Sequence, residues 1–193
     1  MHCIVCCGIL RRELEVLFRE VCGNNQSAPD VVYLEAALHV DFKKIHAALQ
    51  KALTDLSPKY RQLTLVYGQL CHPEMEELAR QFGARAIPAR NCIEMLLGEE
   101  MAKTDQEART FYLTPGWLDN WQKIFIEGLG WDSVEARQNF GFYDRILLLD
   151  TGVTPLAEET ILEFFEYAQV TIEIRPVGLQ NLHKLILNPL QGE

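Results

Sequence analysis

The sequence predicts an α/β protein with a mainly parallel, open sheet and helices on both of its faces. Short apolar runs alternate with amphipathic stretches along the whole chain, as in folds that alternate strand and helix. Residues 145–150 form the most strand-like run and are apolar on both faces, as in a central parallel strand. With 193 residues, 48% of them hydrophobic, the chain can bury one substantial core, so we expect residues 1–193 to form a single domain.

The first half of the chain is expected to contain four strand and helix pairs. Strands are predicted at residues 3–7, 31–34, 63–68 and 86–88, and helices at 11–22, 41–56, 74–82 and 92–97. The second predicted strand ends near Leu38 and His39. Pro73 suits the first turn of the third helix, and Asn91 and Gly98 are typical of the start and end of the fourth.

The second half is expected to continue this alternation. Helices are predicted at residues 99–109, 117–129 and 133–139, from Thr154 and Pro155 to Ala168, and at 179–186, with strands at 110–113, 145–150 and 170–174. Ser133 is the expected cap of the third of these helices, and Asp150 a possible cap of the fourth.

The composition restricts the partners of the protein. A formal net charge of -9 and a pI of about 5.1 argue against binding to nucleic acid or to anionic lipid. No apolar stretch approaches the roughly 20 residues of a membrane-spanning helix, and the N-terminus does not resemble a signal peptide. We therefore expect a cytoplasmic protein, in which its six cysteines stay reduced and bind metal, take part in redox chemistry or pack in the core.

Four potential metal ligands stand where predicted strands end or helices begin: Cys7, His39, Cys71 and Cys92. In an open parallel sheet these positions converge on one crevice outside the carboxyl ends of the strands. Thiolate and imidazole are ligands that zinc prefers, so a zinc site is the first expectation, and three thiolates would also suit an iron–sulfur cluster. The spacing is not that of a zinc finger, and the fold must bring the ligands together.

Neighbouring residues modify this prediction. Cys92 lies in a first helical turn, where the helix dipole, together with Arg90, is expected to lower the thiol pKa. His72 is either a competing ligand or a residue that orients one, whereas His46, on a predicted helix surface, is less promising, as are His2 and His183.

Residues 114–117 read as a tight turn at a strand exit. Gly116 would let a ligand approach the backbone, and Trp117 could form the wall of a cofactor or substrate pocket, although a core tryptophan explains the pattern almost as well. No Ser-His-Asp order, P-loop, GxGxxG or HExxH motif is present. The sequence therefore leaves open whether the protein is an enzyme.

Three segments, residues 67–71, 90–98 and 112–117, resemble an uncharacterised bacterial and archaeal family, a domain of unknown function often encoded beside corrinoid-dependent methyltransferases. The similarity extends to the pairs Cys7-Gly8, Glu13-Leu14 and Leu38-His39. The family pattern places cysteines at the positions of Cys71 and Cys92, and many relatives carry Asp where this chain has Asn91. The resemblance implies a link to one-carbon or corrinoid metabolism.

Three hypotheses follow. The first is a metal-binding accessory protein or enzyme linked to corrinoid-dependent methyl transfer, with a methyltransferase or corrinoid protein as partner. The second is a metal-free thiol enzyme, or a binder of a small molecule or corrinoid, that uses Cys71 or Cys92. The third is a protein-interaction module whose cysteines belong to the core.

Overall fold

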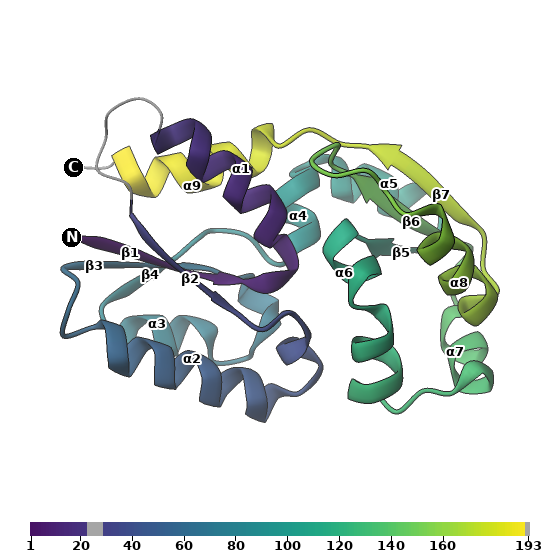
Figure 1. The fold of residues 1–193 in the computed structure, drawn as a ribbon, viewed down its shortest axis with the longest axis horizontal. Coiled ribbons are helices and arrows are strands. Elements are labelled where there is room, and N and C mark those ends of the chain that lie inside the picture. The colour runs from purple at the N-terminus through teal and green to yellow at the C-terminus, as the bar shows by residue number, and fades with distance from the viewer. Residues whose placement is uncertain (23–28, 192–193) are drawn as a thin grey trace.

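The computed structural model describes residues 1–22 and 29–191, which form two α/β halves side by side (Figure 1). The first half contains a four-stranded sheet in the order β2-β1-β3-β4, and the second a three-stranded sheet in the order β5-β6-β7. Every paired strand in both sheets is parallel. The predicted α/β class is confirmed, but the strands form two sheets where a single sheet was expected. The single-domain assignment stays a prediction.

The elements of the first half follow the predicted alternation. They are β1 (His2–Cys7), η1 (Gly8–Leu10), α1 (Arg11–Cys22), β2 (Asp30–Leu34), η2 (Ala36–Val40), α2 (Phe42–Leu56), β3 (Gln62–Val66), η3 (Gln69–Cys71), α3 (Met75–Gln81), β4 (Ala84–Ala86) and α4 (Cys92–Leu97). Here η1, η2 and η3 are short 3₁₀ helices.

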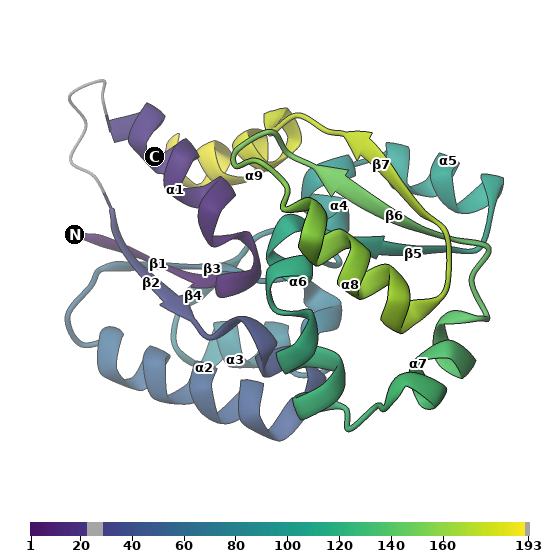
Figure 2. The same ribbon diagram turned by 45° about the vertical axis from the view of Figure 1, so that its right-hand side comes forward.

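The second half begins with α5 (Glu100–Glu107) and ends with a helix that returns to the first half. Its further elements are β5 (Thr110–Leu113), α6 (Pro115–Asp119), the π-helix η4 (Gln122–Gly128), α7 (Ser133–Phe140), β6 (Arg145–Asp150), α8 (Glu158–Ala168), β7 (Ile172–Pro176) and α9 (Gln180–Gln191). After β7 the chain crosses back, so that α9 lies near α1 and packs against α4 (Figures 1 and 2).

Alternation along β1 explains how the first sheet is covered on both faces. Ile4 and Cys6 belong to the buried cluster that includes residues of α1 and α9, whereas Cys3 and Val5 belong to the cluster formed with α2 and α3. Successive strand residues point to opposite faces, so a run that is apolar at every position is buried between two helical layers. The first of these clusters also contains residues of β6, and it therefore extends into the second half.

The second sheet is covered differently on its two faces. Aromatic rings from η4, α7 and α8 pack together on one face, where Phe125, Phe140 and Phe164 are almost fully buried. The side of α5 also carries ion pairs: Arg145 pairs with Glu107 at 2.7 Å and with Glu173 at 3.0 Å. The Arg145 side chain is only 13% exposed, so this pairing is better shielded from solvent than an ordinary surface ion pair.

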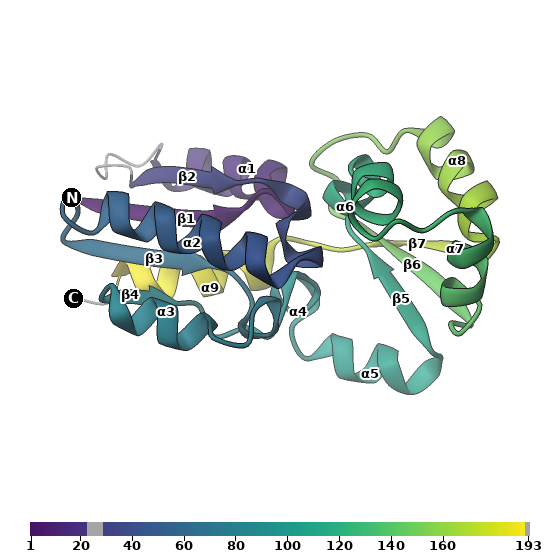
Figure 3. The same ribbon diagram turned by 90° about the horizontal axis from the view of Figure 1, so that it is seen from below.

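The strands of both sheets run toward the junction of the two halves, so their carboxyl ends face each other (Figure 3). At Gly116, in the first turn of α6, a Cβ atom would lie 1.9 Å from the backbone oxygen of Ile9 in η1. Only glycine permits this approach of the two backbones. Around it, Arg12 of α1 pairs with Asp119 of α6 at 2.8 Å.

Glu13 of α1 is buried at the same junction. It is 1% exposed, and its Oε1 accepts a hydrogen bond of 2.9 Å from the hydroxyl of Thr151, directly after β6. Its Oε2 has no hydrogen-bond partner among the described residues. Burial raises the pKa of the Glu13 carboxyl, because the charged form loses its hydration.

Several boundary predictions were wrong, and four of them have a clear local reason. The second strand ends at Leu34, and residues 36–40 form a 3₁₀ helix. Asp132, not Ser133, caps α7, because its carboxylate accepts the N–H groups of residues 134 and 135 in a capping box. Asp150 accepts the N–H of Gly152 in a turn, so it caps no helix, and α8 begins only at Glu158.

Substitution of Gly116 by Ala is expected to lower the thermal midpoint and the free energy of unfolding, by about 1–3 kcal/mol as in overpacked sites. The added Cβ would meet the carbonyl oxygen of Ile9, which is a backbone atom and cannot move aside as a side chain can. Denaturant unfolding in which Gly116→Ala is as stable as wild type would contradict this account.

Substitution of Glu13 by Gln is expected to change the pH dependence of stability. A carboxyl group whose folded pKa is raised contributes stability below its unfolded pKa, and this contribution is lost as pH rises through the folded pKa. The free energy of unfolding of Glu13→Gln, relative to wild type, should therefore increase between about pH 4 and pH 7. Glu20→Gln, on the exposed side of the same helix, is the control for the loss of a surface carboxylate. A pH-independent difference for Glu13→Gln would refute the assignment.

Candidate functional site

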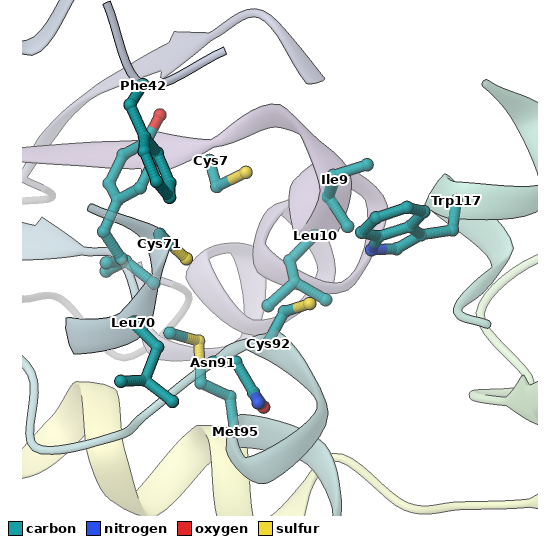
Figure 4. Close-up of a pocket in the computed structure, with 13 residues that line it drawn as sticks. Cys7, Ile9, Leu10, Phe42, Leu70, Cys71, Asn91, Cys92, Met95 and Trp117 are labelled. Carbon is teal, nitrogen blue, oxygen red and sulfur yellow. The ribbon is translucent and has the colours of Figure 1, made fainter. Parts of the chain in front are cut away.

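A pocket of about 360 Å³ opens at the carboxyl end of the first sheet, next to the junction with the second half (Figure 4). Its lining residues are Cys7, Ile9, Leu10, Phe42, Val66, Tyr67, Gly68, Leu70, Cys71, Asn91, Cys92, Met95 and Trp117. No Lys, Arg, His, Asp or Glu is among them. The pocket is therefore largely apolar, and sulfur is its main chemical functionality.

The three predicted cysteines each reach the pocket from a different segment. Cys7 is the last residue of β1, Cys71 ends the 3₁₀ turn after β3, and Cys92 is the first residue of α4. Asn91 caps α4 as predicted, because its side chain accepts the N–H of Glu94 at 2.9 Å. Cys7, Cys71 and Cys92, three of the four residues that the sequence predicted to converge, line this one pocket, and their role as metal ligands stays a prediction.

Gly68 explains why two of these segments lie so close together. A Cβ atom there would lie 2.3 Å from the backbone oxygen of Arg90, so no other residue fits without a shift. The two loops are joined by hydrogen bonds of 2.9 Å from the N–H of Gln69 to the oxygen of Ala89 and from the N–H of Leu70 to the oxygen of Arg90. The loops that carry Cys71 and Cys92 are thus fixed to each other by backbone contacts.

Each of the three sulfurs accepts hydrogen bonds from N–H groups. The backbone N–H of Ile9 donates to Cys7 and that of Gly68 to Cys71. Cys92 accepts from the backbone N–H of Ile93 and from the indole N–H of Trp117 in the second half. Such donors favour the charged form of a sulfur, as a thiolate or as a metal-bound thiolate.

Despite these donors, the free thiols hold their protons. Burial raises the pKa of the Cys7 and Cys71 thiols, and it raises the pKa of Cys92 to about 12. The expectation that the helix dipole and Arg90 would lower the Cys92 pKa was wrong, because desolvation outweighs the N–H donors and Arg90 pairs with Glu94 at 3.0 Å. At neutral pH these cysteines are thiols until a cation stabilises the thiolates.

The spacing of the sulfurs limits what they can bind together. We compared the distances between potential ligand atoms of His, Cys, Asp and Glu side chains in the described residues. In the group His46, His72 and Glu74, these atoms all lie within 4.8 Å of one another. The three cysteines do not form such a group. Tetrahedral zinc, with Zn–S bonds of 2.3 Å, would hold its sulfurs about 3.8 Å apart, so a single zinc ion requires the loops to close.

The other predicted site residues lie as follows. Trp117 lines the pocket, whereas Gly116 packs against Ile9 and is not part of the lining. The backbone of His39 lies in η2, but its side chain is outside the described part of the structure. The roles of Gly116, Trp117 and His39 in ligand binding stay predictions.

Sequence reasoning did not single out three side chains of the pocket lining. They are Phe42, Leu70 and Met95, of which Phe42 is 53% and Leu70 67% exposed. Apolar residues next to helix starts look like ordinary core positions in a sequence. The available signal was Leu70, directly before Cys71. An apolar residue in a short polar turn is not necessarily buried, so it could line a pocket.

His72, next to Cys71, is 6% exposed and points away from the thiol pocket into a neighbouring hollow with Phe42, Lys43, His46 and Glu74. Its Nδ1 accepts the N–H of Glu74 at 3.0 Å, and its ring also donates to the backbone oxygen of Phe42. Burial and the neighbouring His46 lower the His72 pKa. It therefore orients the segment after Cys71 and does not compete for the cysteine site.

Comparison with known proteins gives one family. The sequence model of that family, described as a protein of unknown function (DUF1638), matches residues 33–186. The chain belongs to this family. The part matched to DUF1638 contains Cys71, Cys92 and Trp117, and Cys7 lies before it. No curated protein and no solved structure matches the chain.

Within the described residues, no helix is long and apolar enough to cross a membrane.

Substitution of Trp117 by Phe tests the hydrogen bond to Cys92. It keeps an aromatic ring in the pocket wall and removes the indole N–H that reaches the Cys92 sulfur. We expect the affinity of the cysteines for a bound metal to fall about tenfold, as for other residues that hydrogen-bond to a metal ligand. Chelator competition measures this change, and Trp131→Phe, which alters a tryptophan outside the pocket lining, should leave it unaffected. Equal metal retention by both variants would count against the role of Trp117.

Proposed function

We propose that the protein binds a metal centre through the thiolates of Cys7, Cys71 and Cys92, an iron–sulfur cluster in the first place and a zinc ion in the second. The observation that carries this proposal is the donor set. Three thiols with N–H donors share a pocket that no cationic side chain lines. A bound metal cation would balance the negative charges of the thiolates. It would thereby stabilise the thiolate form, which burial otherwise disfavours.

The spacing of the sulfurs favours a cluster over a single ion. A cluster distributes its cysteine sulfurs over several iron atoms, so it suits thiols that are not all within 4.8 Å of one another. Hydrogen bonds to the sulfurs are one of the factors that set the reduction potential of such a centre. Zinc, the first expectation from the sequence, becomes the second candidate here, since closure of the Cys71 and Cys92 loops onto Cys7 would be needed.

Three protein thiolates would leave one coordination position open toward the pocket. The pocket walls of Ile9, Leu10 and Met95 would exclude water from a small molecule bound there, and Asn91 would supply a polar contact. The resemblance to proteins encoded beside corrinoid-dependent methyltransferases supports an accessory role in methyl transfer, in the cytoplasm, with a methyltransferase or corrinoid protein as partner. The same proposal covers both a binding protein and an enzyme that turns over a small molecule at this open position.

A second candidate is binding of a small molecule or corrinoid without metal. The apolar volume of about 360 Å³ and the exposed Phe42 and Leu70 in its lining favour this function. A nucleophilic thiol enzyme has less support, because the raised pKa of Cys7, Cys71 and Cys92 leaves little thiolate at neutral pH.

Anaerobic purification tests the metal centre directly. We expect wild-type protein to contain iron and acid-labile sulfide, with visible absorption from sulfur-to-iron charge transfer. Each of the three variants Cys7→Ser, Cys71→Ser and Cys92→Ser should lose most of the iron. Cys3→Ala is the control, because Cys3 is a fully buried thiol of the same strand that does not line the pocket.

Each alternative has its own outcome. Stoichiometric zinc without iron would replace the cluster by the single ion. Protein that takes up neither metal, even after anaerobic reconstitution with iron and sulfide, would overturn the metal centre. Loss of iron from Cys3→Ala equal to that from the three serine variants would show that the effect is one of folding.

A further inference from the structure

The side chains of His46 in α2 and of His72 and Glu74 before α3 lie together outside the thiol pocket. Their ligand atoms are all within 4.8 Å of one another, and His46 Nδ1 lies 3.4 Å from Glu74 Oε2. The imidazole rings of His46 and His72 are 5.1 Å apart between centroids. They face a hollow of about 320 Å³ that Phe42 and Lys43 also line.

We propose that His46, His72 and Glu74 form a second metal site, for a divalent ion of the zinc class with one or more positions open to solvent. Two imidazoles and one carboxylate are a ligand set that such ions accept, with bonds of about 2.0–2.2 Å. Donor atoms around one ion then lie about 3.5 Å apart or less. Small rotations of His46 and Glu74, which are 32% and 64% exposed, achieve this closure.

The surroundings of His72 provide a second, independent indication. Histidines that bind metals commonly donate their other ring N–H to a backbone carbonyl, which fixes the ring and its tautomer. The His72 ring donates to the backbone oxygen of Phe42, while its Nδ1 acts as an acceptor at the cluster. Phe42 also packs its ring edge-on against His72 at 5.7 Å. The Nδ1 lone pair is therefore held in a defined direction by a mostly buried side chain.

Coordination has two local costs, which set the expected strength of the site. The Nδ1 of His72 accepts the N–H of Glu74, and an ion would take the place of that donor. Glu74 is exposed, so water can hydrogen-bond to the released N–H. The ammonium group of Lys43, in the same lining, also repels a cation, although Lys43 is exposed and free to turn toward solvent. We therefore expect a weaker site than the three thiolates would form.

Titration of the full-length protein with Co²⁺ and Zn²⁺ tests this site separately from the cysteine centre. Co²⁺ bound by imidazole and carboxylate lacks the sulfur-to-cobalt charge-transfer absorption that thiolates give, so the two sites differ in their spectra. His46→Gln and Glu74→Gln should each reduce the affinity of the sulfur-free site at least tenfold. His183→Gln and Glu76→Gln are matched controls elsewhere and should bind as wild type does.

The cysteine variants distinguish this proposal from the function proposed above. Cys92→Ser should lose the thiolate-bound metal and keep the sulfur-free cobalt signal. Equal binding of Co²⁺ and Zn²⁺ by wild type, His46→Gln and Glu74→Gln would overturn the second site. Loss of the sulfur-free signal in Cys92→Ser, with the thermal midpoint unchanged, would overturn it as well, since the signal would then depend on the thiol pocket.

Discussion

The structure depends on the close approach of backbone segments where the carboxyl ends of its strands meet. Gly68 lets the segment after β3 lie against the start of α4, and Gly116 lets α6 lie against the turn after β1. These contacts involve backbone carbonyl oxygens, of Arg90 and of Ile9, so a side chain at either position could not be accommodated by a change of rotamer. The consequence is a rigid frame that places Cys7, Cys71 and Cys92 around one pocket and brings Trp117 to it from the other half.

Much of this arrangement could be predicted from the sequence, because its signals are local. The apolar runs of β1 and β6 and the cap at Asn91 specify their elements through period and capping, and parallel strands then bring the ends of β1 and β3 to one edge. The division into two sheets could not be predicted in this way. It depends on which strands pair across α4 and α5, and strand periodicity carries no information on that choice.

The electrostatics of the site were also beyond the sequence. Cys92 does lie in a first helical turn, but the effect of a helix N-terminus on its pKa depends on how completely the pocket excludes water. His46 was set aside as a residue of a helix surface, and only the fold shows that this surface faces His72 and Glu74. The signal in the sequence was the Cys71-His72-Pro73-Glu74 segment itself, in which three potential ligands follow one strand within four residues.

That segment connects the two sites physically. Cys71 points into the thiol pocket, while His72, the next residue, points into the hollow beside α2, and Phe42 contributes to the lining of both. Any movement of Cys71 toward a bound metal would pull on His72, whose ring is held between the Phe42 oxygen and the Glu74 N–H. Conversely, an ion at His72 would release Glu74 N–H and alter the start of α3. Because both changes act on the same few residues of backbone, occupancy of one site should change the affinity of the other, with the same coupling in both directions.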